Sequence, residues 1–164
     1  MKRCLYHLLS AFLLLPAGCT NPADKAPTTV TAPPPTAASA APGEPWTAAE
    51  LLAPAALAAQ LRGPGPAPVV FDMGPAGTIK GARPIGPAQE EASLVKLRTA
   101  LAGLPKDQPV VVYCGCCPFA PCPNIRPAFR LLLAEGFTQA RLLNLPHNLK
   151  ADWIDAGYPM ASSK

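Results

Sequence analysis

The chain has few of the side chains on which common types of active site depend. It contains only two histidines, and aromatic residues make up 6% of it and charged residues 15%. No paired carboxylates, phosphate-binding loop or serine–histidine–aspartate set is visible in the sequence. We therefore do not expect the chemistry of a glycosidase, a P-loop nucleotidase or a serine hydrolase.

Positive charge is also limited, and this bears on the kind of partner. The formal net charge is +4, and Lys2 and Arg3 supply two of those charges. There is no basic stripe with interleaved aromatic residues, so a nucleic-acid partner is not expected. No segment beyond the N-terminal region is long and apolar enough to span a bilayer, and no internal repeat is visible.

The N-terminus has the pattern of a targeting segment. Two basic residues precede an apolar run over residues 8–15, which is too short to cross a bilayer as a helix. The following Ala-Gly-Cys19 resembles the lipobox of bacterial lipoproteins, in which the cysteine is acylated and becomes the first mature residue. The resemblance implies a signal peptide over residues 1–18 and a lipid anchor on Cys19, on the periplasmic side of the bacterial cell envelope. Thr20 favours the outer membrane, and an ordinary cleaved signal peptide is the alternative.

Residues 19–45 then form a spacer rich in proline, alanine and threonine. Such a composition cannot bury a core, and we expect an extended, disordered linker that begins with the lipidated cysteine. The remaining residues 46–164 amount to roughly 120, enough for one domain with one core. We expect this domain to be a monomer.

Strand and helix patterns alternate along residues 46–164. We expect helices over residues 46–61 (interrupted at Pro54), 89–101, 124–135 and 149–156, and strands at residues 69–72, 110–113 and 141–145, with residues 74–87 irregular. Thr47 and Glu50 fit a capping box for the first helix, Asn124 can cap the third, and Gly136 should end it. This order predicts a single α/β domain whose mostly parallel sheet is flanked by helices on both faces. The loops that follow the strands should then meet at one edge, where ligands bind in open α/β sheets.

The chain is, by contrast, rich in thiols. Four cysteines lie in the segment VVVYCGCCPFAPCPN, directly after the expected central strand, namely Cys114, Cys116, Cys117 and Cys122. With Cys4 in the signal peptide and Cys19 acylated, they are the only thiols of the expected mature chain. Outside the cytoplasm three interpretations stay open: a reactive thiolate with resolving neighbours, two disulfides that staple the loop, or a Cu(I) or Zn site.

Cys114 is the strongest candidate for a reactive thiolate. It directly follows a strand, where loop N–H groups and the N-terminus of the next helix favour an anion. Arg126 in the first helical turn adds a positive charge, and both effects lower a thiol pKa. Asp72 is expected to orient the loop. His147 is interpreted either as an exposed loop residue or as a base or ligand beside Cys114.

Several short motifs follow one another along residues 46–164. They are a strand ending in Asp72, the GTIKGA segment at residues 77–82, the strand leading to Cys114, Glu135-Gly136-Phe137, Trp153 and Gly157-Tyr158-Pro159. In their order and spacing they resemble the rhodanese-like family over most of this domain. The cysteine segment resembles that of a subgroup of bacterial secreted members with a CGCCP…CPN loop. The chain departs from the family pattern in its longer loop, in Thr78 in place of histidine and in Gly74 in place of arginine.

The resemblance implies that Cys114 is a nucleophile that carries a persulfide. A persulfide beside three further thiols can be attacked by them, which yields a disulfide and sulfide. We therefore expect sulfur transfer or sulfur-linked thiol redox chemistry, with a small sulfur-containing substrate or a thiol reductant and no cofactor. A Cu or Zn binding module and a non-catalytic interaction domain with a stapled loop are the alternatives.

Overall fold

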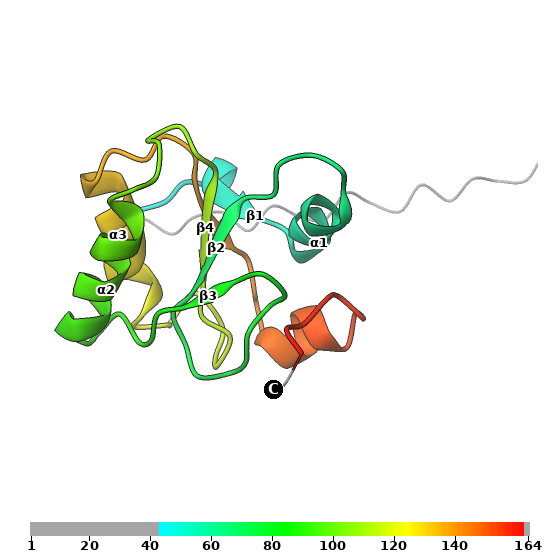
Figure 1. Ribbon diagram of the computed structural model, residues 1–164. Coiled ribbons are helices and arrows are strands. Elements are labelled where there is room, and N and C mark those ends of the chain that lie inside the picture. Colours follow the sequence, from blue (N-terminus) through cyan, green and yellow to red (C-terminus); the bar gives the residue numbers. More distant parts are fainter. Residues whose placement is uncertain (1–42, 163–164) are drawn as a thin grey trace, which may run out of the picture. The chain divides into compact units, whose positions relative to one another are not determined.

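An unbroken apolar run forms the central strand of the sheet. Strand β4 (Val110–Tyr113) is buried along its whole length in the computed structural model, which describes residues 43–162. Four further parallel strands flank it in the order β1-β5-β4-β2-β3 (Figure 1), namely β1 (Leu51–Leu52), β2 (Val69–Asp72), β3 (Arg83–Pro84) and β5 (Ala140–Leu143). Since β4 has a partner on both sides and is covered on both faces, every residue of it can be apolar.

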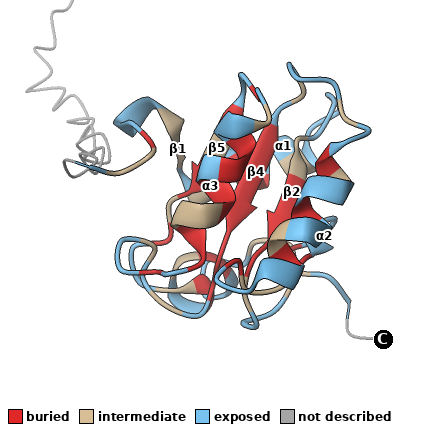
Figure 2. Cartoon of the chain, turned by 90° about the vertical axis from the view of Figure 1, so that its left-hand side faces the viewer, coloured by how far each residue is buried: buried red, intermediate tan, exposed pale blue. Residues whose placement is uncertain are grey.

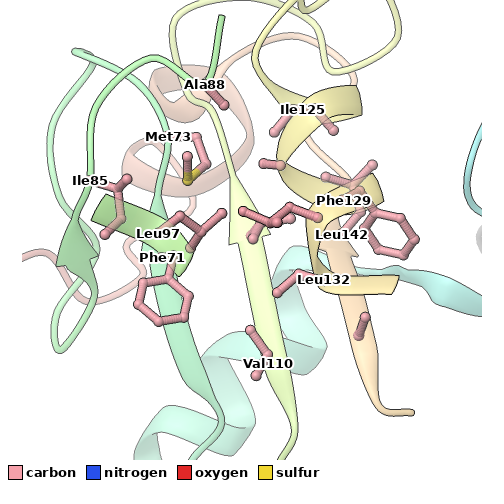
Figure 3. Close-up of a cluster of buried hydrophobic side chains, with 14 of the residues drawn as sticks. Phe71, Met73, Ile85, Ala88, Leu97, Val110, Ile125, Phe129, Leu132 and Leu142 are labelled. Atoms are coloured by element: carbon pink, nitrogen blue, oxygen red, sulfur yellow. The ribbon is translucent and has the colours of Figure 1, made fainter. Parts of the chain in front are cut away.

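Helices cover both faces of the sheet. Successive side chains of β4 point to opposite faces, so its four apolar residues can all be buried only if both faces are covered. Val110 and Val112 pack with residues of α2 (Glu91–Leu101) and α3 (Ile125–Ala134), and Figure 3 shows this layer. Val111 and Tyr113 pack on the other face, with α1 (Pro54–Arg62) and the π-helix η2 (Lys150–Ile154). Figure 2 shows that burial is concentrated along β2 and β4, between the two layers. The predicted α/β class with a parallel sheet is confirmed.

Helix α3 is amphipathic and ends as the sequence predicts. Its buried residues face the sheet, and Phe129 and Leu132 belong to the core. Gly136 has a φ of +81°, and its N–H donates to the Leu133 carbonyl at 3.0 Å. The Phe137 N–H donates to the Leu132 carbonyl at 3.1 Å, which completes a Schellman motif.

The first part of the domain differs from the prediction of two helical pieces. Thr47 and Glu50 do form a capping box, but on a single 3₁₀ turn, η1 (Ala48–Glu50). The next two residues form edge strand β1, which pairs with β5. Pro54 occupies the first turn of α1, where its missing N–H costs nothing, so it begins a helix rather than interrupting one.

Two other predicted elements are also modified. The segment 74–87 was expected to be irregular, yet Arg83 and Pro84 pair with the end of β2 as edge strand β3. The last helix is a five-residue π-helix and not a regular helix over residues 149–156. The predicted signal peptide, the lipidation site Cys19 and most of the predicted linker lie outside the described residues. Within residues 43–162, no helix has the length and hydrophobicity needed to cross a bilayer.

Candidate functional site

Three loops meet at the carboxyl edge of the sheet, around the residue that follows β4. Cys114 is that residue, and it is 1% exposed. The loop after β2 lies beside it, because the Met73 N–H donates to the Tyr113 carbonyl at 2.8 Å. The loop after β5 closes the other side, where the Leu149 N–H donates to the Gly115 carbonyl at 2.9 Å. The predicted meeting of these loops at one edge is therefore confirmed.

The four cysteines form one cluster of free thiols. The sulfur of Cys114 lies 3.4 Å from that of Cys116, which in turn lies 3.6 Å from that of Cys117. Cys122 is buried and its thiol donates to Cys114, whereas Cys116 is exposed. The structure thus places the buried sulfur of Cys114 next to the solvent-exposed Cys116.

The surroundings of Cys114 favour its thiolate. The Cys122 thiol, the backbone N–H of Cys116 and the Asn124 amide donate to its sulfur, and against the opposing effect of burial they lower the pKa of Cys114 from 9.0 to about 5. Partial desolvation beside the cluster and the negative neighbour raise the pKa of Cys116 to about 12, although Cys116 as a whole is exposed. Hydrogen bonding to Cys114, followed by burial, also raises the pKa of Cys122. The Cys114 thiolate is therefore held by donors that include the thiols of Cys122 and Cys116.

Asn124 is a site residue that the sequence analysis assigned to a different role. It precedes α3, but its side chain makes no capping hydrogen bond. Instead the side chain is 5% exposed and lies between two loops. Its Nδ2 donates to the Cys114 sulfur at 3.6 Å, and its Oδ1 accepts from the Gln89 N–H at 3.2 Å. The only sequence signal that Asn124 contacts Cys114 is its position directly after the Cys122-Pro123 pair.

The hydrogen-bond partners of Arg126 are groups other than the Cys114 sulfur. Its guanidinium donates to the Cys122 carbonyl at 3.2 Å, to the Ala120 carbonyl and to Glu44. It also lies over the ring of Trp46, 5.6 Å from the ring centre. These contacts give Arg126 a role in holding the shape of the cysteine loop, and the predicted effect of its charge on the pKa of Cys114 stays a prediction.

Asp72 orients the loop after β2. The residue is 2% exposed, and its carboxylate accepts from the Gly74 N–H at 3.0 Å and from the Thr78 hydroxyl at 3.2 Å. Burial raises the pKa of Asp72, although these hydrogen bonds oppose the effect. A Cβ atom at Gly74 would lie 2.7 Å from the Cys114 sulfur, so only glycine lets this loop approach the thiolate so closely.

His147 lies in the loop after β5, and its side chain is 72% exposed. Its Nδ1 pairs with the Asp152 carboxylate at 2.7 Å, at the start of η2. Of the two interpretations, the geometry matches an exposed loop histidine and not a base directed at Cys114. Across residues 43–162, no three or more His, Cys, Asp or Glu side chains are arranged to hold a metal ion.

A pocket of about 550 Å³ opens beside the cluster. The residues that line it are all uncharged, namely Gly74, Pro75, Gly86, Pro87, Gln89, Cys116, Pro123 and Asn124. A smaller hollow of about 260 Å³ lies at the opposite edge of the sheet, among residues that precede the strands, such as Pro68, Pro109 and Gln139. Only the larger pocket reaches the thiols.

Comparison with known proteins gives information on the fold alone. No family model matches the chain, and no curated protein matches it. A solved structure with a similar fold is the Alr3790 protein from Anabaena sp., with a TM-score of 0.50 and 23% sequence identity. The match covers 68% of this chain and 91% of that one. At this level of identity, the likeness extends to the arrangement of strands and helices and not to chemistry.

Proposed function

We propose that this protein carries out sulfur transfer or sulfur-linked thiol redox chemistry through the thiolate of Cys114. The observation that carries the proposal is the buried Cys114 sulfur, whose pKa is lowered to about 5 by the donors around it, in contact with a second thiol. The resemblance of the sequence to the rhodanese-like family supports the same assignment. The proposal includes attachment to the bacterial cell envelope through Cys19, which rests on the sequence alone.

The first step is attack of the Cys114 thiolate on a sulfane sulfur. With an organic hydropersulfide, R–S–SH, the thiolate takes the outer sulfur as Cys114–S–SH and the R–S⁻ thiolate leaves. The bond between the two donor sulfurs breaks, and a new one forms at Cys114. The Asn124 amide and the Cys116 N–H, which donate to the sulfur of Cys114, hold it in place for this attack.

The second step couples sulfur transfer to redox chemistry. The Cys116 sulfur is 3.4 Å from that of Cys114 and attacks the inner sulfur of the persulfide. The proton of the Cys116 thiol passes to the departing outer sulfur, so that hydrogen sulfide leaves and a Cys114–Cys116 disulfide forms. The sulfane sulfur gains two electrons, and the two cysteines lose them. A dithiol reductant must then restore both thiols.

The lowered pKa favours Cys114 more as a leaving group than as a nucleophile. At pH 7 a pKa of about 5 in place of 9.0 raises the thiolate fraction about a hundredfold. Intrinsic nucleophilicity falls with the pKa, with a Brønsted coefficient of about 0.4–0.5, which costs about forty- to a hundredfold. The two effects nearly cancel in the rate at which Cys114 attacks a donor. The lowered pKa therefore mainly speeds the steps in which Cys114 leaves as a thiolate.

Sulfide release from a small organic hydropersulfide, with dithiothreitol as reductant, tests the proposal. The wild type should release sulfide above the rate measured without protein, and Cys114→Ser should reduce release to that background. Cys117→Ser is the matched control, because the sulfur of Cys117 contacts Cys116 and not Cys114. It should keep most of the wild-type rate. Equal rates for wild type and Cys114→Ser would refute the proposal.

A further inference from the structure

The two sulfurs of the Cys114–Cys116 pair differ in their access to solvent. Cys114 is 1% exposed and lies behind Gly74, where a Cβ atom would come within 2.7 Å of its sulfur. Cys116 is exposed and lines the pocket of about 550 Å³. A thiol that enters from solvent to attack the disulfide therefore meets Cys116 first. A small sulfur donor must pass Cys116 to react at Cys114, because Cys114, and not Cys116, has the lowered pKa.

We propose that Cys116 is the sulfur at which an external dithiol reductant attacks the Cys114–Cys116 disulfide, so that the mixed disulfide forms on Cys116 and Cys114 leaves. This inference rests on the proposed function, because that function produces the disulfide. Beyond that function, the inference specifies that the sulfur of Cys116 faces the partner. It also specifies the chemical class of the partner, which is a reduced dithiol.

The access argument follows from the requirements of thiol–disulfide exchange. The attacking thiolate must reach one sulfur while the other leaves, so the accessible sulfur is attacked. The Cys114 sulfur is covered by the Asn124 amide, 3.6 Å away, and by the buried Cys122. Direct attack on Cys114 requires the loop after β2 or the start of α3 to move.

The leaving-group argument points in the same direction. The thiol with the lower pKa leaves faster. In the reduced protein, donors from Cys122 and Asn124 and the Cys116 N–H lower the pKa of Cys114 to about 5, whereas the surroundings of Cys116 raise its pKa. The Cys122, Asn124 and Cys116 N–H donors do not depend on the Cys116 thiol and remain available to a Cys114 thiolate that leaves the disulfide. Attack at Cys116 therefore expels the better leaving group, and attack at Cys114 would expel the poorer one.

The pocket provides room for the partner's cysteine. Besides Cys116, it is lined by uncharged residues that include Pro75, Pro87 and Gln89. Uncharged lining residues do not repel the attacking thiolate, and they offer no charge to attract a charged segment of the partner. We therefore expect the residues beside the partner's cysteine to be uncharged.

The complete cycle balances in atoms and electrons. One thiolate of the dithiol attacks Cys116, the Cys114–Cys116 bond breaks, and Cys114 leaves as the thiolate. The second thiol of the partner then attacks its own sulfur in the mixed disulfide, and its proton passes to the departing Cys116. The partner ends as a disulfide, having given two electrons, and Cys114 and Cys116 are restored.

A single-thiol probe stops this cycle at the mixed disulfide. The full-length protein is oxidised with an organic hydropersulfide, exposed briefly to glutathione, quenched in acid and alkylated, and the cysteines are located by fragmentation mass spectrometry. Glutathione is expected on Cys116 and the alkyl label on Cys114. Glutathione on Cys114 or Cys117 would overturn the inference.

Two variants and the wild-type glutathione map together distinguish failure of this inference from failure of the proposed function. Cys116→Ser, at an exposed position that does not threaten folding, should still gain sulfur on Cys114 but lose roughly tenfold or more of its reductant-driven turnover. In Cys117→Ser, glutathione should still be found on Cys116. If Cys116→Ser turns over at the wild-type rate while Cys114 gains sulfur, the disulfide step of the proposed function fails and this inference fails with it. If the wild type forms the disulfide but glutathione is found on Cys114, only this inference fails. If Cys114 never gains sulfur, the proposed function fails and this inference fails with it.

Discussion

Replacing Asn124 by aspartate tests how the thiolate of Cys114 is stabilised. The Asn124 Nδ2 donates to the Cys114 sulfur at 3.6 Å, while Oδ1 accepts from the Gln89 N–H. Aspartate keeps the acceptor and the shape but replaces the donor with a negative oxygen. The substitution should therefore raise the pKa of Cys114 with little change in the backbone.

The size of the effect follows from the hydrogen bond that is lost. A hydrogen bond to a charged group contributes about 1.5–3 kcal/mol, which corresponds to about one to two pKa units. The contact to Cys114 is long, so the lower end applies, and Asn124→Ala should raise its pKa by about one unit from its value of about 5. Asn124→Asp should raise it further, because the two negative charges repel each other.

The pKa of Cys114 is measured from the Cβ chemical shifts of the four loop cysteines in an NMR pH titration. This readout reports ionisation without requiring a reagent to reach a buried sulfur. Gln139→Glu is the control, since it adds a negative charge at the opposite edge of the sheet, and it should leave the midpoint unchanged. A midpoint for Asn124→Asp equal to that of the wild type would refute the role assigned to Asn124.

Four further outcomes are expected. Gly74→Ala places a methyl group 2.7 Å from the Cys114 sulfur and should slow persulfide formation by up to about a hundredfold; an unchanged rate by mass spectrometry would contradict the close approach. Arg126→Ala should speed hydrogen exchange of the cysteine-loop amides, because the Cys122 carbonyl loses its donor; unchanged exchange would argue against that bracing role. Phe129→Ala should lower the free energy of unfolding by about 3–5 kcal/mol in urea, and a loss well below that would mean a looser core. Between pH 9.0 and about 5 the unfolded Cys114 thiol binds more protons than the folded one, so stability should fall as pH falls through this window, and the fall should be smaller in Cys114→Ser.

The central part of the fold could be predicted from the sequence because the pattern there is local and strong. The run Val110–Tyr113 and the amphipathic residues before Gly136 each specify one element, and both are found as predicted. Strands β1 and β3 were missed because each has only two residues, and no periodicity can be recognised over that length. They become strands only through pairing with β5 and β2, which is a tertiary effect.

The position of the candidate site could also be predicted, but not the roles of its polar residues. The place of Cys114 after a central parallel strand follows from the order of elements. Asn124 was assigned to helix capping, because a local pattern does not show that the loop after β4 brings a sulfur to its amide. Arg126 turns toward Glu44, a residue assigned to the linker, so its direction depends on a contact far away in sequence.

The most direct test of the account is to follow one added sulfur atom. The full-length, reduced protein is mixed with one equivalent of an organic hydropersulfide without reductant, quenched in acid after short times, and mapped by fragmentation mass spectrometry. The account predicts one extra sulfur on Cys114 at the earliest times, followed by its loss and a Cys114–Cys116 disulfide. Stable addition to Cys116 or Cys117, with Cys114 unmodified throughout, would contradict it.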